Sequence, residues 1–294
     1  MKNFKGIVYA ALSSSTFGLA PLFSILLLSD GFSSFEVLSY RWGVASLTLG
    51  IVRLAGGCRF RISRQELCTV FFLSLFRAAT SLSLVIAYQN ISSGVASIIH
   101  FMYPLAVALA MMCFFREKGS VWVFAAIGMS IVGAVLLSLG NVDFTRGNTT
   151  LGMVSAAVSV VSYGGYIVGV RKSRAVGIDS TVLTCYVMGL GALYFIAGGL
   201  VTGGIRIETD GTAWLCILGV ALPATAVSNM TLVQAIKRIG PTLTSVFGAL
   251  EPLTAVVIGV AVFGEPFTTQ GAAGILLIVA AVTIVILHSG RRKA

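Results

Sequence analysis

Four ionisable side chains lie inside long apolar stretches of this sequence: Arg41, Arg77, His100 and Glu251. An ionisable group that faces lipid is costly, so such residues face protein or water and commonly bind a substrate, an ion or a proton. Arg77 and Glu251 each lie roughly 15 Å from the inner end of their stretch, at about 1.5 Å per residue, and therefore at the same depth. We interpret them as groups that flank a central cavity, as partners or as a gate. The alternative is a buried pair that only holds helices together.

Several polar or aromatic residues could line the same cavity. His100 could bind substrate or carry a proton, because histidine titrates near neutral pH, or it could be a neutral side chain bonded to a neighbouring helix. Ser97, His100 and Pro104 share one helical face, and Tyr103 lies on an adjacent one. We predict no catalytic residue and no metal ligand. The predicted substrate-binding set is Thr16, Arg41, Arg77, Tyr88, His100, Tyr103, Tyr163, Asn229 and Glu251. For its uncharged members, a satisfied contact between helices is the alternative.

Pro104 and Pro252 interrupt two apolar stretches at corresponding places. Each proline removes one helix hydrogen bond and frees a carbonyl. Inside a membrane such a break is tolerated where neighbours, side chains or water satisfy the freed group. Paired breaks indicate a binding site or a hinge, and a simple packing kink is the alternative. Pro21 and Pro223 have no such counterpart.

These residues must be positioned by helices in a membrane. Of the 294 residues, 57% are hydrophobic and 10% are charged, against about 25% charged residues in ordinary soluble proteins. This composition excludes a soluble globular domain, a disordered chain and a disulfide-stapled secreted fold. The five cysteines are scattered without metal-binding spacing, so we expect no metal or other cofactor. The net charge is +10, and the charged residues lie between the apolar stretches. This distribution indicates basic loops at a membrane and not a nucleic-acid partner.

The apolar stretches predict ten membrane-spanning helices, since one span needs about 20 apolar residues. The first stretch is long for the apolar core of a signal peptide and is expected to remain as a helix. The predicted spans are residues 6–28, 33–54, 66–88, 92–115, 120–139, 151–170, 180–201, 212–236, 241–263 and 268–287.

The basic residues orient these spans. With the N-terminus in the cytoplasm, alternate crossing places 16 of the 20 Lys and Arg in cytoplasmic segments. The outer loops then hold only Arg146 and Arg206, while Arg41 and Arg77 lie inside spans. Cytoplasmic loops of membrane proteins are enriched in Lys and Arg in this way. The distribution predicts a multi-pass protein of a bacterial inner membrane with both termini in the cytoplasm.

The two halves of the chain resemble each other. The aligned pairs include Gly6 with Gly152, Ser13 with Ser159, Gly18 with Gly164, Leu84 with Leu232, Pro104 with Pro252 and Glu117 with Glu265. Each half contains five predicted spans, an odd number, so the second half must enter the membrane from the opposite side. We predict an all-α integral membrane protein of two inverted five-helix repeats, residues 1–146 and 147–294, around a central cavity. Inverted repeats are typical of transporters, and duplication for packing alone is the alternative.

Two motifs carry a family resemblance. Tyr103-Pro104 is followed by Phe115-Arg116-Glu117, and Glu251-Pro252 by Phe263-Gly264-Glu265, so a mid-helix proline precedes a helix-end glutamate by thirteen residues in both halves. Over the whole chain this resembles the EamA-type transporters of the drug/metabolite transporter superfamily. Ser39-Tyr40-Arg41-Trp42 looks like the arginine-bearing second helix of that family. The stretch from His100 to Pro104 is similar to a short motif of its aromatic amino-acid exporters. Arg116 stands where the family pattern has glycine.

The resemblance implies an inner-membrane exporter of amino acids, other metabolites or drugs. We predict a secondary transporter that exports a small organic metabolite, such as an amino acid or an amphipathic amine, by alternating access. An uncoupled facilitator or channel and a multidrug exporter are the alternatives. The expected partners are a small-molecule substrate, membrane lipids and, if transport is coupled, protons. The sequence contains no HExxH, GxSxG or CxxC motif, so we do not expect an enzyme.

Overall fold

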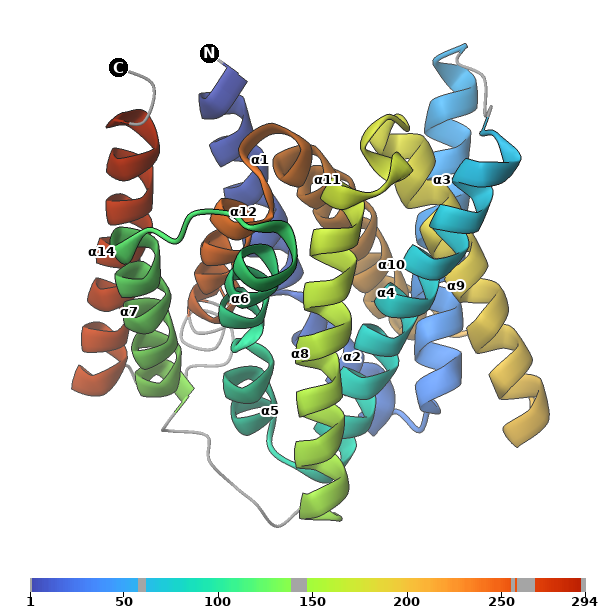
Figure 1. The fold of residues 1–294 in the computed structure, drawn as a ribbon. Helices are drawn as coiled ribbons and strands as arrows, with labels where there is room; N and C mark the ends of the chain where they lie inside the picture. Colours follow the sequence, from blue (N-terminus) through green and yellow to red (C-terminus); the bar gives the residue numbers. More distant parts are fainter. Residues whose placement is uncertain (1, 58–61, 139–146, 255–256, 258–267, 292–294) are drawn as a thin grey trace.

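The structure, a computed structural model, is a bundle of α-helices that run back and forth between two ends (Figure 1). It describes residues 2–57, 62–138, 147–254, 257 and 268–291. Within these ranges the chain forms helices, turns and bends and no β-strand, which confirms the prediction of an all-α protein. Arg146, the second part of the ninth predicted span and the Phe263-Gly264-Glu265 motif lie outside the described residues.

The described elements follow one another with short connections. In the first half they are α1 (Lys2–Phe17), α2 (Ala20–Ser29), α3 (Ser34–Ala55), α4 (Arg64–Asn90), α5 (Ser93–His100), α6 (Tyr103–Phe115) and α7 (Val121–Ser138). In the second half they are α8 (Thr149–Lys172), η2 (Arg174–Val176), α9 (Ser180–Thr202), α10 (Gly211–Ala221), the π-helical η3 (Leu222–Val227), α11 (Ser228–Ile239), α12 (Pro241–Val246), η4 (Phe247–Ala249) and α14 (Thr269–Arg291).

Local side-chain contacts fix where several of these helices begin and end. Ser33 and Ser63 each accept a hydrogen bond from the backbone N–H three residues later, and the glutamates there, Glu36 and Glu66, accept one from the serine N–H. This reciprocal pattern satisfies N–H groups that have no partner inside the helix. Arg116 ends α6 with a φ of 52°, and it is the one non-glycine residue with positive φ in the described part of the chain. A glycine would adopt that conformation without strain.

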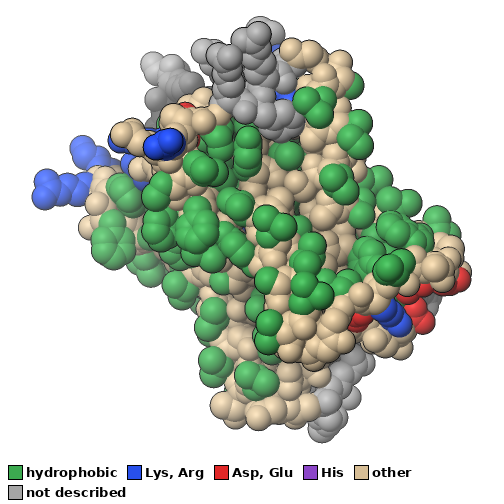
Figure 2. All heavy atoms as spheres, turned by 90° about the vertical axis from the view of Figure 1, so that its right-hand side faces the viewer, with side chains coloured by type: hydrophobic (Ala, Val, Ile, Leu, Met, Phe, Trp, Pro, Cys, Tyr) green, Lys and Arg blue, Asp and Glu red, His purple; other side chains and the backbone are tan. Residues whose placement is uncertain are grey.

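Most described helices are long and apolar enough for a membrane. Seven segments qualify: Phe4–Ser29, Arg64–Asn90, Ser93–Phe115, Thr149–Lys172, Ser180–Thr202, Gly211–Ile239 and Thr269–Leu287. Val121–Leu137 is a shorter apolar helix, and the 22-residue α3 carries Glu36, Arg41 and Arg53. Hydrophobic side chains cover the middle of one face of the molecule, and charged ones gather toward its two ends (Figure 2). The chain is therefore a multi-pass membrane protein. The count of ten spans stays a prediction.

The main packing contacts join the first half of the chain to the second. α3 packs along α9, α4 along α8, α1 along α11, and α7 along α14. Trp42 of α3 lies so close to Gly191 of α9 that a Cβ there would be 2.1 Å from the indole ring. The hydroxyls of Ser13 and Ser228 each donate a hydrogen bond to the other residue's carbonyl, at 2.8 and 3.0 Å, and so tie α1 to α11. The two halves therefore share one core.

Within the described residues, helical spans are interrupted at four places. Gly18 and Leu19 separate α1 from α2, Phe101 and Met102 separate α5 from α6, and η3 joins α10 to α11. Proline lies in the first turn after each break or in the irregular segment itself, as Pro21, Pro104 and Pro223. Because proline has no N–H to donate to the preceding turn, the helix separates into two at these places. Pro252 follows the 3-10 turn η4 in the span that begins with α12.

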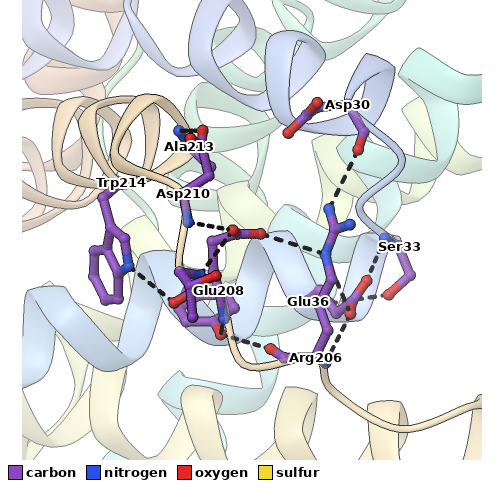
Figure 3. Close-up of polar contacts among 10 residues, drawn as sticks. Asp30, Ser33, Glu36, Arg206, Glu208, Asp210, Ala213 and Trp214 are labelled. Atoms are coloured by element: carbon purple, nitrogen blue, oxygen red, sulfur yellow. Dashed lines mark hydrogen bonds and ion pairs between the residues drawn. The ribbon is translucent and has the colours of Figure 1, made fainter.

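The two ends of the bundle differ. The start of α1 and the end of α14 lie at the same end (Figure 1). At the opposite end a polar cluster links the α2–α3 corner to the segment that precedes α10 (Figure 3). Arg206 Nε lies 3.9 Å from a carboxylate oxygen of Glu36 and 3.7 Å from one of Glu208, and Nη2 donates to the carbonyl of Asp30 at 3.3 Å. This cluster ties the first half to the second at that end.

Candidate functional site

Arg77 lies in the middle of α4 and is 1% exposed. Its Nε donates a hydrogen bond to Oδ1 of Asn229 on α11 at 2.8 Å, and its Nη1 donates to the hydroxyl of Ser81 at 3.3 Å. Its guanidinium carbon also lies 5.3 Å from the ring centre of Phe17 and 5.1 Å from that of Tyr163. Because arginine is always charged, these contacts hold a full positive charge inside the bundle.

Arg41 on α3 is a second buried cation beside the first. Its Nε donates a hydrogen bond to the hydroxyl of Thr225 in η3 at 2.6 Å. Its guanidinium carbon lies 5.7 Å from the ring centre of Phe17, so both arginines lie against the same aromatic ring. Asn229, one turn beyond Thr225, donates from Nδ2 to the Thr225 carbonyl at 2.8 Å. The interrupted span η3–α11 in the second half of the chain thus accepts hydrogen bonds from both buried arginines of the first half. π-Helical segments such as η3 are frequent at functional sites.

Glu251 is the carboxylate of this region, and it contacts a tyrosine. Its Oε1 accepts a hydrogen bond from the hydroxyl of Tyr103 at 3.3 Å. The rings of Tyr103 and Tyr163, with centres 4.6 Å apart, connect Glu251 to Arg77. The ion pairs within the described ranges are Arg53–Asp179, Arg206–Glu36 and Arg206–Glu208. Arg77 and Glu251 therefore share one cluster without a direct ion pair in this conformation.

Two glycines allow the close approach of chain segments around Glu251. A Cβ on Gly248 would lie 1.6 Å from the hydroxyl oxygen of Tyr103. A Cβ on Gly18, at the break between α1 and α2, would lie 2.6 Å from the carbonyl oxygen of Glu251. Real side chains do not tolerate such distances, so both positions need glycine for this arrangement.

His100 is the last residue of α5 and is 4% exposed. Its Nδ1 lies 2.8 Å from the hydroxyl of Ser159 on α8, and its ring centre is 5.3 Å from those of both Tyr103 and Tyr163. Its Nε2 is buried and has no hydrogen-bond partner among the residues that the structure describes. A buried nitrogen without a partner is costly. A polar group in the adjacent cavity could form the missing hydrogen bond with this nitrogen.

A small cavity lies among these side chains. Its volume is about 40 Å³, and its lining includes Phe17, Tyr88, Ser97, His100, Glu251 and Pro252. One water molecule needs roughly 10–15 Å³ of such volume, so the cavity has room for a few waters and not for a metabolite. Arg41 and Arg77 do not line the cavity; both contact Phe17, which does.

Most of the predicted binding residues meet in this region. Thr16 differs, because its hydroxyl donates to the carbonyls of Leu12 and Ser13 in its own helix, at 2.7 and 3.1 Å. Sequence reasoning misses Phe17 and Thr225. The repeat alignment is the signal that could find them, since it places Phe17 opposite Tyr163 and Thr225 opposite Arg77. The members of the predicted set that form or line the cluster are Arg41, Arg77, Tyr88, His100, Tyr103, Tyr163, Asn229 and Glu251.

Comparison with protein families gives a match to the family described as the EamA-like transporter family, over residues 4–139 and 150–287. The chain belongs to this family. The predicted resemblance is thereby confirmed, and the family is one of membrane transporters. Its two matched stretches lie one in each half of the chain.

Related proteins carry the same broad description. The chain is 25% identical to the uncharacterized transporter YojE of Bacillus subtilis, covering 91% of this chain and 89% of that protein. It is 24% identical to an uncharacterized transporter of Archaeoglobus fulgidus, covering 81% and 83%. It is 21% identical to the uncharacterized inner membrane transporter YicL of Salmonella typhimurium, covering 78% and 76%. A solved crystal structure with 18% identity matches all of this chain and 99% of its own with a TM-score of 0.80, which supports the fold.

Proposed function

We propose that this EamA-family protein is a secondary transporter that exports a small organic metabolite from the cytoplasm across a bacterial inner membrane by alternating access. Both termini lie in the cytoplasm in this proposal, in agreement with the excess of Lys and Arg on that side. The observation that carries the proposal is the buried polar cluster, which forms where the two halves of the chain meet. Transporters built from inverted repeats hold their substrate at such an interface.

Contacts between equivalent residues support the inverted repeat. The alignment that pairs Gly18 with Gly164 makes Phe17 equivalent to Tyr163, and these two rings stack with centres 6.3 Å apart. The alignment of Pro104 with Pro252 makes Tyr103 equivalent to Glu251, and Tyr103 donates its hydrogen bond to Glu251. Equivalent residues touch one another only close to an axis that exchanges the halves. We therefore place that axis through the cluster.

The helix packing is unchanged when the halves are exchanged. In the repeat alignment α1 corresponds to α8, α3 to α9, the α10–α11 span to α4, and α7 to α14. Exchange converts the α1–α11 contact into the α8–α4 contact, and it converts the α3–α9 and α7–α14 contacts into themselves. The family match over residues 4–139 and 150–287 supports the same division. Ten spans in two inverted halves, residues 1–146 and 147–294, account for these observations.

Alternating access assigns a role to each part of the site. The cavity of about 40 Å³ must widen before a metabolite can enter. The helix breaks beside Pro104 and Pro252 are the proposed hinges, because a break leaves fewer hydrogen bonds to resist bending. The Arg206 cluster at the end opposite the termini is a contact between halves that has to open when the site faces outward. Protons could couple through His100 or Glu251, which both line the cavity.

Export from cells tests the proposal. Cells with and without the protein are grown on a labelled carbon source, and the labelled metabolites in the medium are compared. We expect at least one metabolite to accumulate outside the cells that express the protein. Glu251→Gln abolishes that accumulation, whereas Glu117→Gln, a change of the same kind at an exposed position, preserves it. If the labelled metabolites in the medium were the same for all strains, the proposal would be contradicted.

Counterflow in liposomes separates the alternative functions. A carrier accumulates labelled substrate transiently against an outward gradient of unlabelled substrate, because each turnover exchanges one molecule for another. An uncoupled channel gives no such overshoot. Transport of several chemically unrelated compounds with equal rates would favour a multidrug exporter. A collapse of transport on removing the pH gradient would establish proton coupling.

A further inference from the structure

The charges buried at the cluster do not balance. Arg41 and Arg77 are 5% and 1% exposed, and each carries a permanent positive charge. Within the described ranges, Glu251 is the one carboxyl group that lines the cavity or contacts its wall, since the other acidic residues lie at or beyond helix ends. Two cations therefore face at most one anion. Buried charges without partners are costly, so an arrangement of this kind favours a negatively charged ligand.

The two guanidiniums also have unused donors. Each has five N–H groups in a planar fork. In the described part of the chain Arg41 makes one hydrogen bond, to Thr225, and Arg77 makes two, to Asn229 and Ser81. Both contact the Phe17 ring, which lines the cavity beside the break between α1 and α2. The Phe17 ring therefore lies between the cavity and both forks, and its displacement would bring the forks closer to the cavity. Forks of this geometry match a carboxylate.

A second observation points to a ligand in the same place. His100 lines the cavity, is 4% exposed, and has a buried Nε2 without a partner among the described residues. Its ring contacts those of Tyr103 and Tyr163, and Phe17 stacks on Tyr163, so the aromatic contacts are continuous. Aromatic walls with one free polar position suit an apolar or aromatic body that carries one further polar group.

We propose that the substrate is a small organic monoanion, with one carboxylate bound by Arg41 and Arg77 and an apolar or aromatic body packed among Phe17, Tyr103 and Tyr163. The inference rests on the proposed transport function and names the substrate class of that site. With Glu251 ionised, the excess is one positive charge, which one carboxylate neutralises and a phosphate dianion would overcompensate. An amphipathic amine would add a third cation to the cluster, and a zwitterion would leave the excess charge in place.

Three probes with one shared body test the charge preference. 3-Phenylpropanoate, phenylalanine and 2-phenylethylamine all contain a phenylethyl group and differ in carrying a carboxylate, both charges, or an ammonium group. Each is titrated onto the purified protein in detergent, and binding is followed by the shift of the melting temperature. We expect 3-phenylpropanoate to bind most tightly, phenylalanine at least tenfold more weakly, and the amine without a measurable shift. Equal or tighter binding of the amine or of phenylalanine overturns the inference, as does the absence of a shift with 3-phenylpropanoate at millimolar concentration.

Arginine variants test the assignment of the carboxylate. Arg41→Gln removes one of the two cations proposed to bind the carboxylate, and we expect it to weaken binding of 3-phenylpropanoate by about 10- to 100-fold, the usual loss for a charged hydrogen bond. Arg41→Lys keeps the charge but loses the planar fork, so it should recover only part of the affinity that Arg41→Gln loses. Arg171→Gln, the same change at an exposed position of α8, should leave it unchanged. Unaltered affinity in Arg41→Gln and Arg77→Gln overturns the inference, and Arg41→Gln decides alone if Arg77→Gln does not fold.

Counterflow separates this inference from the proposed function. Arginine-dependent binding of 3-phenylpropanoate without counterflow in liposomes would support the anion site and contradict the transporter. Counterflow of 2-phenylethylamine that is indifferent to Arg41→Gln would support the transporter and contradict the anion site. We expect counterflow of 3-phenylpropanoate that is lost in Arg41→Gln.

Discussion

Asn229→Ala is the most direct perturbation of the buried charge at the centre of the bundle. Asn229 is 0% exposed, accepts the Arg77 Nε hydrogen bond at 2.8 Å and donates to the Thr225 carbonyl at 2.8 Å. A hydrogen bond to a charged group contributes about 1.5–3 kcal/mol, and a neutral one about 1 kcal/mol. We therefore expect a loss of about 3 kcal/mol in the free energy of unfolding. At about 2 °C per kcal/mol for a chain of this size, the melting temperature falls by roughly 6 °C.

A double-mutant cycle assigns that loss to the pair. Arg77→Met removes the charge and keeps a long apolar side chain in its place, so the Asn229 oxygen loses its donor. When both residues are changed, no guanidinium is left unpaired. The double variant should then be more stable than the sum of the two single changes predicts, by about 2 kcal/mol. The readout is the melting temperature of each purified variant in the same detergent.

The control is Thr231→Ala on the same helix. Thr231 is 2% exposed, and its hydroxyl donates to the carbonyls of Val227 and Ser228 in its own span. It should cost about 1 kcal/mol and show no coupling to Arg77→Met. Strict additivity of Asn229→Ala and Arg77→Met would refute the reasoning, because it would mean that the buried charge does not depend on this amide.

Three further predictions follow from single positions. Gly248→Ala should lower stability by about 1–3 kcal/mol and impair transport, because the new methyl would lie 1.6 Å from the Tyr103 hydroxyl oxygen and displace it. Gly43→Ala, whose Cβ would have open space around it, should change neither stability nor transport. Arg116→Gly should raise the melting temperature by removing a strain of about 1 kcal/mol at a φ of 52°, and a decrease would contradict this. Arg206→Gln should cost under about 1 kcal/mol. It should also speed the reaction of a membrane-impermeant thiol reagent with a cysteine introduced into the cavity lining as Ser97→Cys; an unchanged labelling rate would show that this cluster does not limit opening.

The ionisable residues of the candidate site could be selected from the sequence because an ionisable side chain that faces lipid is energetically costly. Arg77, His100 and Glu251 had to face protein wherever their helices lay, and the structure brings them into one cluster. The partner of Arg77 did not follow from depth alone. Glu251 lies at the same depth in the sequence map, yet the rotation of each helix about its axis decides which side chains meet, and that rotation gives Arg77 to Asn229.

Thr16 and Phe17 show how a shift of one residue along a helix changes what a side chain contacts. The polar residue is the natural choice for a cavity, but one residue along a helix turns the side chain by about 100°. Thr16 bonds to its own helix, and the adjacent Phe17 carries the aromatic contacts of the cluster. Phe17 was hard to select because an aromatic residue in an apolar stretch looks like packing. Its equivalence to Tyr163 in the repeat alignment is a stronger signal than its residue type.

The breaks at the prolines were also only partly predictable. The two halves were expected to bend at Pro104 and Pro252, which correspond to each other. The structure separates the helices fully at Pro104 and adds breaks at Pro21 and Pro223, which have no counterpart in the other half. A proline frees a carbonyl wherever it occurs, but whether the helix then kinks or ends depends on the neighbours that accept the freed groups. Sequence patterns do not contain that information.

The chemical asymmetry between equivalent positions gives a final prediction. Arg77 is equivalent to Thr225, so the cation occurs in the first half only. Exchanging the two, as Arg77→Thr with Thr225→Arg, keeps the charge count. It also brings a second guanidinium next to Arg41, whose Nε lies 2.6 Å from the Thr225 hydroxyl. Two like charges about 4 Å apart repel by about 4 kcal/mol at an effective dielectric constant of 20. The exchanged variant should therefore melt below the single Arg77→Thr variant. If it melts higher, the number of buried charges matters and their placement does not, and the repulsion from Arg41 inferred here is wrong.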